Sequence, residues 1–545
     1  MKRTLILSLL LVCAGFLFAN GEQETVQNFD LSGPGELPFV KNVKGEVPTL
    51  TIYTHTRPNV DSFEENEFTK WLEETTGINL DFIVVPEADG YKKLNVLMAS
   101  GEYPDIITGF RLMSPPQIKM YGEEGVILSL NDLIEKHGVE TKKMYELFPS
   151  ALDKTSFNGQ IYCLPHINEC YHCTSPCKMW VYKPWLDKLG LDVPTTTQEF
   201  EEMLIAFKTQ DPNGNGIADE IPLMGSKTGW HNNIEHFLMN SFLYYDPDKS
   251  GRYIKDGKVQ IAFYEDGWRE GYAYINNLVD KGLVPTETWT QDYSLLTQIV
   301  ESSPHVVGCA PGGWQGMFCH LSASEKWKDY IAIAPLKGPK GVQNATWIPY
   351  GAVDVKWMIT NKCKYPELAM KLADFLYNKE VSIRSAIGRP GIEWDYLPKD
   401  TELKDVDGNP AEIIHRVSCD EAPANVCWNA ASLYMNAKAT NLRVAVTSAN
   451  AMSIPLDSAT KNNYLPYVPS LKTVFPPLVF NEEEAEELAL ITSDMRTYQK
   501  EVSAQFAVGV KDVNEYWDEY LKQLKLIGID RMIEIYQAAY DRKYN

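Results

Sequence analysis

Leu50-Thr51-Ile52-Tyr53-Thr54-His55 decides the fold, because this apolar and β-branched run predicts a buried strand that starts a regular alternation. Helical patterns over 61–76 and 91–99 then alternate with strand patterns over 79–85 and 105–107. A strand-helix-strand order of this kind predicts an open α/β sheet with helices on its faces. In such sheets, ligands bind beyond the carboxyl ends of the strands.

The alternation recurs further along the chain, which ends in a helical region. A chain of 545 residues is too long for one hydrophobic core, so we expect two or three domains. Residues 20–46 are polar and aperiodic, and they predict a linker. The later elements that we expect are helices over 199–208 and 367–377, strands over 330–334 and 357–359, and helices that follow Asn481 and cover 513–527 and 531–543.

Charge excludes one class of partner. The formal net charge is -22, from 51 basic and 73 acidic residues. An acidic surface repels phosphate backbones and anionic lipid, so we expect no nucleic-acid partner.

The N-terminus predicts export from the cytoplasm. Lys2-Arg3 precedes an apolar run over 4–18, and Ala19 supplies a small residue for cleavage, as in a secretory signal peptide. Cys13 raises the alternative of a lipid anchor, but Val12 stands where lipoprotein processing requires a small residue. We therefore expect a periplasmic or extracellular protein that is exported in soluble form.

Four of the ten cysteines lie in one short segment, at Cys163, Cys170, Cys173 and Cys177. In an oxidising compartment the expectation is a disulfide within this cluster. Buried free thiols are one alternative. A metal site that includes His166 and His172 is another. Cys419 and Cys427 form a second possible pair.

The segment Asp211-Pro212-Asn213-Gly214-Asn215-Gly216-Ile217-Ala218-Asp219-Glu220 has the pattern of a calcium loop, with oxygen side chains at positions 1, 3, 5 and 9 and glycine at 6. Pro222 stands where an EF-hand has its bidentate glutamate, so Glu220 is expected to complete the coordination shell of the ion instead. A plain Asn-Gly turn between a helix and a strand is the alternative. The expected ligands of a structural calcium ion are Asp211, Asn213, Asn215, Ile217 (through its carbonyl), Asp219 and Glu220.

Several predicted loops combine aromatic rings with polar side chains, the two kinds of group that a sugar requires. Rings stack on the apolar faces of a sugar, and polar side chains hydrogen-bond its hydroxyls. A place in the core is the alternative for each such residue. The candidate ligand-binding residues are His55, Arg57, Arg111, Glu169, Tyr171, His172, Trp230, His231, Trp314, Trp347, Tyr350, Arg389, Glu393 and Trp394.

Signatures of catalysis are missing from the sequence. It contains no Gly-x-Ser-x-Gly elbow, no His-Glu-x-x-His and no phosphate-binding glycine loop. Carboxylate pairs such as Glu393 and Asp395 leave a secreted glycoside hydrolase or polysaccharide lyase as the alternative function. A binding protein for cationic peptides or lipids is a third, weaker interpretation.

Five segments carry a resemblance to a known family. They are Gly101 to Ile107, Asn158 to Tyr162, Trp185 to Thr196, Asp211 to Pro222 and Tyr536 to Arg542. With them, the chain resembles the family 1 extracellular solute-binding proteins, in the branch of the alginate-oligosaccharide-binding proteins. The resemblance covers nearly all of the chain after the signal peptide.

This resemblance implies a type II periplasmic-binding-protein fold, with two α/β lobes that close like a hinge on an oligosaccharide. It implies an N-terminal lobe over 47–166 and 336–380, and a C-terminal lobe over 167–335 and 381–545 that ends in a helical extension. It also implies a monomer without enzymatic activity that delivers its sugar to the permease subunits of an ABC transporter. In alginate-binding members the segment that matches Asp211 to Glu220 binds calcium, which supports the same role here.

Overall fold

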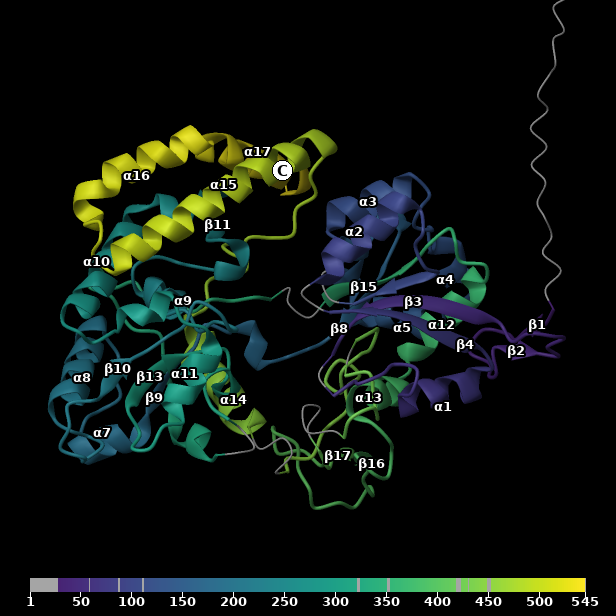
Figure 1. Ribbon diagram of the computed structural model, residues 1–545, viewed down its shortest axis with the longest axis horizontal. Coiled ribbons are helices and arrows are strands. Elements are labelled where there is room, and N and C mark those ends of the chain that lie inside the picture. Colours follow the sequence, from purple (N-terminus) through teal and green to yellow (C-terminus); the bar gives the residue numbers. More distant parts are fainter. Residues whose placement is uncertain are drawn as a thin grey trace, which may run out of the picture.

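The described part of the chain forms two lobes, each built around its own sheet (Figure 1). The structure is a computed structural model, and it describes residues 28–57, 59–86, 89–109, 112–320, 324–349, 353–417, 423–429, 431–447 and 452–544. The predicted signal peptide, Cys13, Arg111, Tyr350 and Cys419 lie outside these residues. None of the described helices is both long and apolar enough to cross a membrane.

The first lobe contains a five-stranded sheet in the order β4-β3-β5-β15-β8. The strands β3, β4 and β5 are parallel, whereas β15 is antiparallel to both of its neighbours. This arrangement confirms the strand-helix alternation that starts at Leu50. The strands are β3 (Thr49–His55), β4 (Asn79–Val85), β5 (Ile106–Thr108), β8 (Leu164–Ile167) and β15 (Val353–Ile359).

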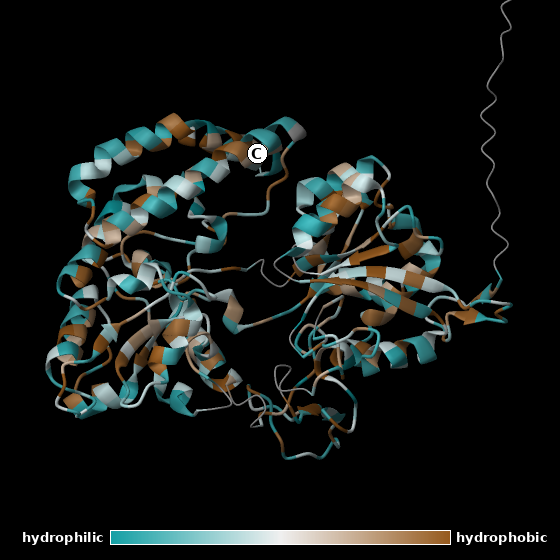
Figure 2. Ribbon diagram, in the orientation of Figure 1, coloured by the Kyte–Doolittle hydropathy of each residue, from teal (hydrophilic) through white to brown (hydrophobic). Residues whose placement is uncertain are grey.

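Helices cover this sheet, whose strands carry many hydrophobic residues (Figure 2), and the apolar side chains between the two layers are buried. Leu50, Ile52 and Trp357 are fully buried in one continuous core. The helices of the lobe are α1 (Glu67–Thr76), α2 (Gly90–Ser100), α3 (Pro115–Glu123), α4 (Asn131–His137), α5 (Glu140–Leu147), α6 (Leu152–Thr155), α12 (Pro366–Leu376) and α13 (Lys379–Ile387).

The first helix begins later than the predicted range of 61–76. The side chain of Asn66 accepts a hydrogen bond from the backbone N–H of Phe68 and caps α1. The preceding turn is held instead by Asn425, whose Oδ1 accepts from the N–H groups of Asp61 and Ser62. The apolar spacing in the sequence continues through this turn and therefore overstated the helix.

The second lobe contains a four-stranded sheet in the order β10-β13-β9-β14. The fully buried side chains of Val181 and Ile333 lie in its core together with Phe200 and Trp268. The strands are β9 (Met179–Tyr182), β10 (Ile221–Leu223), β13 (Val307–Pro311) and β14 (Tyr330–Ile333), and a separate hairpin comprises β11 (Arg252–Lys255) and β12 (Lys258–Ile261). The helices are α7 (Lys183–Leu189), α8 (Thr197–Thr209), α9 (Glu235–Leu238), α10 (Asp266–Asp280), α11 (Tyr293–Val300) and α14 (Ser453–Ala459).

Three helices complete the second lobe, as the C-terminal pattern predicts. They are α15 (Glu482–Ala507), α16 (Val513–Ile527) and α17 (Ile529–Tyr544). The predicted capping box is present, because Asn481 Oδ1 accepts from Glu484 N–H while the Glu484 carboxylate accepts from Asn481 N–H. Met495, Trp517 and Ile535 lie in the core of the second lobe.

The expected linker over 20–46 is wrong for its described part, residues 28–46. This segment forms a small two-stranded sheet, β1 (Asp30–Leu31) and β2 (Val40–Lys41), on the first lobe. Phe29, Phe39 and Val40 are buried in that lobe's core. Three apolar side chains among polar neighbours are enough to dock the segment, although they give no periodic signal.

The lobe boundaries as a whole stay a prediction, and the packing differs from them after residue 380, where α13 with Val381 still belongs to the first lobe. Trp428, Leu433 and Met435, which the sequence places in the C-terminal lobe, are buried in the core of the first lobe. A small sheet of β16 (Trp394–Tyr396) and β17 (Ile413–His415) lies beside them. The chain thus crosses between the lobes at 168–178 and 334–349, and α14 lies again in the second lobe.

His415 gives the small sheet a testable pH dependence. Its buried Nε2 has no hydrogen-bond partner, and burial lowers the pKa of the imidazole from 6.5 to about 4. The unfolded chain therefore binds this proton at a higher pH than the folded chain. The stabilising contribution is present above pH ~6.5 and is lost as the pH falls towards ~4.

We predict that His415→Phe reduces the loss of unfolding free energy between pH 6.5 and 4 by about 2–3 kcal/mol. Urea unfolding at a series of pH values measures this difference. His320→Phe, at an exposed side chain, serves as the control. Equal pH slopes for the wild type and His415→Phe would contradict the assignment.

Candidate ligand-binding site

A cavity of about 380 Å³ lies where the chain crosses between the lobes. We call it the pivot cavity. Its lining includes Glu169 and Tyr171 from the first crossing segment, Ile348 from the second, Asp354 from β15, and Lys438. Because the crossing segments form its wall, any change in the angle between the lobes changes the shape of this cavity.

A second cavity of about 770 Å³, which we call the interlobe cavity, is lined by both lobes. The first lobe supplies Lys154 and Phe157, and the second lobe supplies Arg252 and Phe475. Asp354 lines both cavities, so the two are neighbours along the junction of the lobes. Another cavity, of about 870 Å³, is lined by residues of the second lobe, such as Tyr253 and Tyr540, and by Val342 and Asn344 of the second crossing segment.

The pivot cavity offers the two kinds of group that bind a carbohydrate. Tyr171 supplies an aromatic ring, and the Lys438 Nζ lies 4.3 Å from the centre of that ring. Burial raises the pKa of the Tyr171 phenol, so the ring keeps its proton. Glu169, Asp354 and Lys438 supply charged groups around it. An aromatic face with hydrogen-bonding edges is therefore in place at the pivot.

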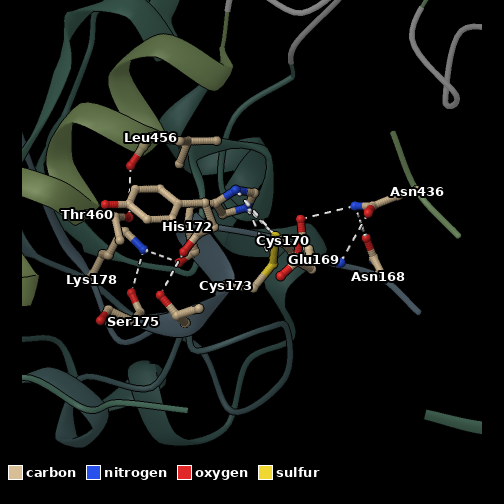
Figure 3. Close-up of a disulfide and its surroundings, with 12 residues drawn as sticks. Asn168, Glu169, Cys170, His172, Cys173, Ser175, Lys178, Asn436, Leu456 and Thr460 are labelled. Carbon is tan, nitrogen blue, oxygen red and sulfur yellow. Dashed lines mark hydrogen bonds between the residues drawn. A yellow bond between two sulfur atoms is a disulfide. The ribbon is translucent and has the colours of Figure 1, made fainter. Parts of the chain in front are cut away.

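A disulfide between Cys170 and Cys173 lies in the wall of the pivot cavity (Figure 3). It confirms the expected disulfide within the cysteine cluster, whereas Cys163 and Cys177 are buried free thiols. The ring of His172 lies against both sulfurs, and burial lowers its pKa to about 3. His172 is therefore neutral near pH 7 and supports the wall without adding charge to it.

Asn436 follows Met435 of the first lobe's core and connects the first crossing segment to that lobe by hydrogen bonds (Figure 3). Its Nδ2 donates to Asn168 Oδ1 at 2.7 Å and to the carbonyl of Glu169 at 3.0 Å. Its Oδ1 accepts from the N–H groups of Glu169 and Ala439. One side chain thus fixes the backbone that presents Glu169 and Tyr171.

The structure brings only some of the sequence-predicted residues together. Glu169 and Tyr171 line the pivot cavity, and the ring of Trp230 lies 6.1 Å from that of His172, which is flanked by the lining residues Tyr171 and Cys173. Trp347 is partly exposed next to Ile348. Whether these residues bind a ligand stays a prediction.

Other predicted residues lie away from the two junction cavities. His55 is fully buried, Trp314 packs against a core cluster of the second lobe, and Arg57 Nε donates to the carbonyl of Asn429. His231 is buried next to Cys177. These residues were chosen because they follow predicted strands or lie in predicted loops. Such positions do not show whether a side chain faces a ligand or the core.

The cluster of Arg389, Glu393 and Trp394 is structural in its contacts. The Arg389 guanidinium binds both carboxylate oxygens of Glu393 and also reaches Glu67. Burial raises the pKa of Glu393, but the hydrogen bonds and charge of Arg389 outweigh it, and the pKa is lowered overall. Trp394 is fully buried, with its indole N–H on the carbonyl of Gly388. These polar and aromatic side chains contact one another and the backbone, so their presence in one segment does not indicate a ligand site.

Several residues that line the junction were missed in the sequence. Asp354 is the one acidic residue of strand β15, which also holds Lys356, and an acidic residue in a strand does not by itself indicate a binding site. Lys154 donates to the carbonyl of Val353 and lies in a short helix without an apolar pattern. Lys438 is remote in sequence from every other lining residue.

The predicted calcium loop joins α8 to β10, as expected. The carboxylate of Asp211 accepts from the N–H groups of Gly214, Asn215 and Gly216, and the side-chain amides of Asn213 and Asn215 donate to Asp219. The side chains of Asp211, Asn213, Asn215 and Asp219 therefore lie together in one loop. Glu220 Oε1 is buried without a hydrogen-bond partner, and burial, with the charges of Asp211 and Asp219, raises the pKa of Glu220.

Comparison with known proteins decides the family. The profile of the bacterial extracellular solute-binding proteins matches residues 57–383, which is more than half of the chain. The chain belongs to this family. The two sheets and the crossing segments described above are the architecture of a solute-binding protein.

Individual solute-binding proteins align along most of the chain. The fructooligosaccharide ABC transporter substrate-binding protein FusA of Streptococcus pneumoniae is 28% identical over 487 residues, or 86% of each chain. Its structure with kestose has a TM-score of 0.75 at 26% identity and covers 91% of this chain and 99% of FusA. FusA has also been solved as an EF-hand mutant with fructo-nystose.

Two further relatives are more distant. The alginate-binding protein AlgQ2 has a TM-score of 0.67 at 24% identity, over 91% of this chain and 99% of AlgQ2, and shares the fold. Lipoprotein LipO of Bacillus subtilis is 25% identical over 62% of this chain and 64% of LipO. These matches confirm the expected two-lobed fold and the expected family.

We predict that Asn436→Ala lowers the unfolding free energy by about 1–3 kcal/mol, because four hydrogen bonds are lost and their partly buried partners stay unpaired. Urea unfolding measures the change. Asn462→Ala, which removes one exposed contact to Ser458, is the matched control. An Asn436 variant as stable as the Asn462 variant would show that the crossing does not depend on this side chain.

Proposed function

We propose that this protein captures an oligosaccharide between its two lobes and presents it to the permease subunits of an ABC transporter. The observation that carries the proposal is the pivot cavity, in which the crossing segments themselves present Tyr171 and Glu169. A ligand held there contacts the hinge directly. Its binding free energy then favours the angle between the lobes at which it makes the most contacts.

The relatives support the choice of ligand. FusA, which is similar over 86% of this chain, is named for fructooligosaccharides and has been solved with kestose. The interlobe cavity, next to the pivot cavity, adds room for further sugar units. It also adds Phe157, Phe475 and Arg252, whose guanidinium lies 4.6 Å from the ring centre of Tyr536.

Capture without catalysis fits the site better than hydrolysis does. The carboxylates considered for a hydrolase are committed to ion pairs, since Glu393 binds Arg389 and Asp395 lies 3.5 Å from Arg416. The relatives are substrate-binding proteins of transporters. We therefore propose a monomeric, exported binding protein that works outside the cytoplasm, released by signal peptidase rather than anchored at Cys13.

We also propose that the loop from Asp211 to Glu220 binds a structural calcium ion. The residues fit a hard cation, because each of the five side chains carries an oxygen that can bind it and Glu220 has a buried oxygen without a partner. Asp211, Asn213, Asn215, Asp219 and Glu220 would hold the ion with their side chains, and Ile217 with its carbonyl. The similarity to FusA, which has been studied as an EF-hand mutant, supports this role.

For the sugar site, we predict saturable binding of one or more fructooligosaccharides by isothermal titration calorimetry, with no product formed. Tyr171→Ala is expected to weaken binding by about tenfold or more, because a stacking face worth at least about 1.4 kcal/mol is lost. Glu169→Gln tests the polar edge of the same cavity.

The control is Tyr293→Ala, since this tyrosine is 46% exposed and lies outside both junction cavities. Unchanged binding in both Tyr171→Ala and Glu169→Gln would show that the ligand does not bind in the pivot cavity. Release of shorter sugars by the purified wild type would favour the hydrolase alternative.

For the calcium loop, we predict that calcium raises the melting temperature and that a chelator lowers it. At a calcium concentration of about 100 times Kd the stabilisation is about 2.7 kcal/mol. Asp219→Asn and Glu220→Gln are expected to remove this response in differential scanning calorimetry. Asp405→Asn is the matched control, because Asp405 holds a similar turn through the N–H groups of Asp407 and Asn409. A calcium response that persists in Asp219→Asn and Glu220→Gln would place the ion elsewhere.

A further inference from the structure

A second group of potential metal ligands lies inside the second lobe, at Cys177, His231 and His236. Cys177 ends the first crossing segment, whereas the two histidines flank the start of α9. The ligand atoms of the three residues lie within 4.8 Å of one another. Cys177 and His231 are buried, and the thiol of Cys177 is not in a disulfide.

The distances between these atoms match those around a tetrahedral ion. Cys177 Sγ lies 3.4 Å from His231 Nδ1, and His231 Nδ1 lies 3.2 Å from His236 Nδ1. Bonds of about 2.3 Å to sulfur and 2.0–2.1 Å to nitrogen, at tetrahedral angles, separate S and N by about 3.5 Å and two N atoms by about 3.3 Å. Two of the three distances thus agree with a tetrahedral site, and the third, between Cys177 and His236, is within 4.8 Å.

Hydrogen bonding alone does not satisfy the group. A neutral imidazole nitrogen carries either one proton or one lone pair. His231 Nδ1, however, has two short contacts, one to the thiol of Cys177 and one to His236 Nδ1. It can share one proton well with only one of them. A cation at the centre would accept a lone pair from all three atoms.

The surroundings of His231 also favour coordination through Nδ1. Its Nε2 is buried without a hydrogen-bond partner and faces Asp248 Oδ2 at 3.7 Å. A carboxylate behind the far nitrogen orients a metal-bound imidazole. In addition, His231 has a left-handed backbone with a φ of 61°, a conformation that non-glycine residues adopt mainly where the surroundings impose it.

The charges near the group compensate a divalent ion. The carboxylates of Asp246 and Asp248 act on Cys177, and Asp246 Oδ2 is buried without a hydrogen-bond partner. Lys178 opposes them, but its ammonium is directed away, since it donates to the carbonyls of His172 and Ser175.

We propose that Cys177, His231 and His236 bind a d-block divalent cation of the zinc class. One thiolate and two imidazoles are the donors that such an ion prefers, and they differ from the oxygen ligands that calcium takes. The ion fastens the end of the first crossing segment to the second lobe. It lies behind Trp230, whose ring contacts those of His172 and His231, and thereby stiffens the wall of the pivot cavity.

The neighbouring group of Cys170, His172 and Cys173 is a poorer candidate. Its two sulfurs are joined in the disulfide, so neither offers a thiolate (Figure 3). This difference allows the two groups to be separated in one experiment, provided that the disulfide is left intact.

The test uses cobalt(II) as a spectroscopic substitute for zinc. The full chain is unfolded with a chelator, refolded without reductant in the presence of cobalt(II), and freed of excess metal. We expect one tightly held ion with a near-ultraviolet thiolate-to-cobalt band and the visible bands of a tetrahedral site. Calcium kept in excess occupies the oxygen loop and prevents cobalt from binding there.

Cys177→Ser is expected to abolish the thiolate band, and His236→Gln to weaken cobalt affinity at least tenfold. Cys309→Ser, at a buried free thiol of the same lobe, and the double variant Cys170→Ser/Cys173→Ser are expected to keep the band. A wild type without the band, or a band that survives in Cys177→Ser, overturns the proposal.

X-ray absorption on the zinc-loaded wild type gives a result that does not depend on any variant folding. The expected shell contains one sulfur at about 2.3 Å and two imidazole nitrogens at about 2.0–2.1 Å. A shell of oxygen atoms alone, or one with two sulfurs, overturns the assignment to these three residues.

Discussion

The connection between the two lobes is the constraint on which the rest of the structure depends. Each lobe closes its own core, with the five-stranded sheet in one and the four-stranded sheet in the other. The polar contacts of Asn436 with Asn168 and Glu169 hold the place where the chain passes between them. Since the pivot cavity is built from this crossing, the proposed ligand site and the proposed hinge are one structural unit.

The same crossing explains why chemistry accumulates in a short segment. Between β8 and β9 the chain carries the lining residues Glu169 and Tyr171, the Cys170–Cys173 disulfide, and Cys177. For the proposed closure, parts of this connection must change conformation while other parts stay fixed. The disulfide closes a tight loop within the segment itself, the proposed metal ion fastens the end of the segment to the second lobe, and Asn436 holds its start.

Periodic patterns in the sequence predicted most of the helices and strands, but they did not predict which side chains line the cavities between the lobes. The alternation after Leu50 and the capping box at Asn481 are local signals, and both are confirmed. The docking of Phe39 on the first lobe, and the return of Trp428 to its core, depend on contacts between residues far apart in the chain. Glu169 and Tyr171 were candidates because a carboxylate and an aromatic ring lie close together in the sequence, and both line the pivot cavity. Asp354 and Lys438 were missed, because only the folded chain brings them to the pivot.

The central claim is that a sugar binds between the lobes and draws them together. Small-angle X-ray scattering of the purified chain, with and without saturating kestose, tests it most directly. If the lobes close on the sugar, the radius of gyration is smaller in the presence of kestose while the molecular mass is unchanged. Calorimetric evidence of kestose binding together with an unchanged radius of gyration would contradict it.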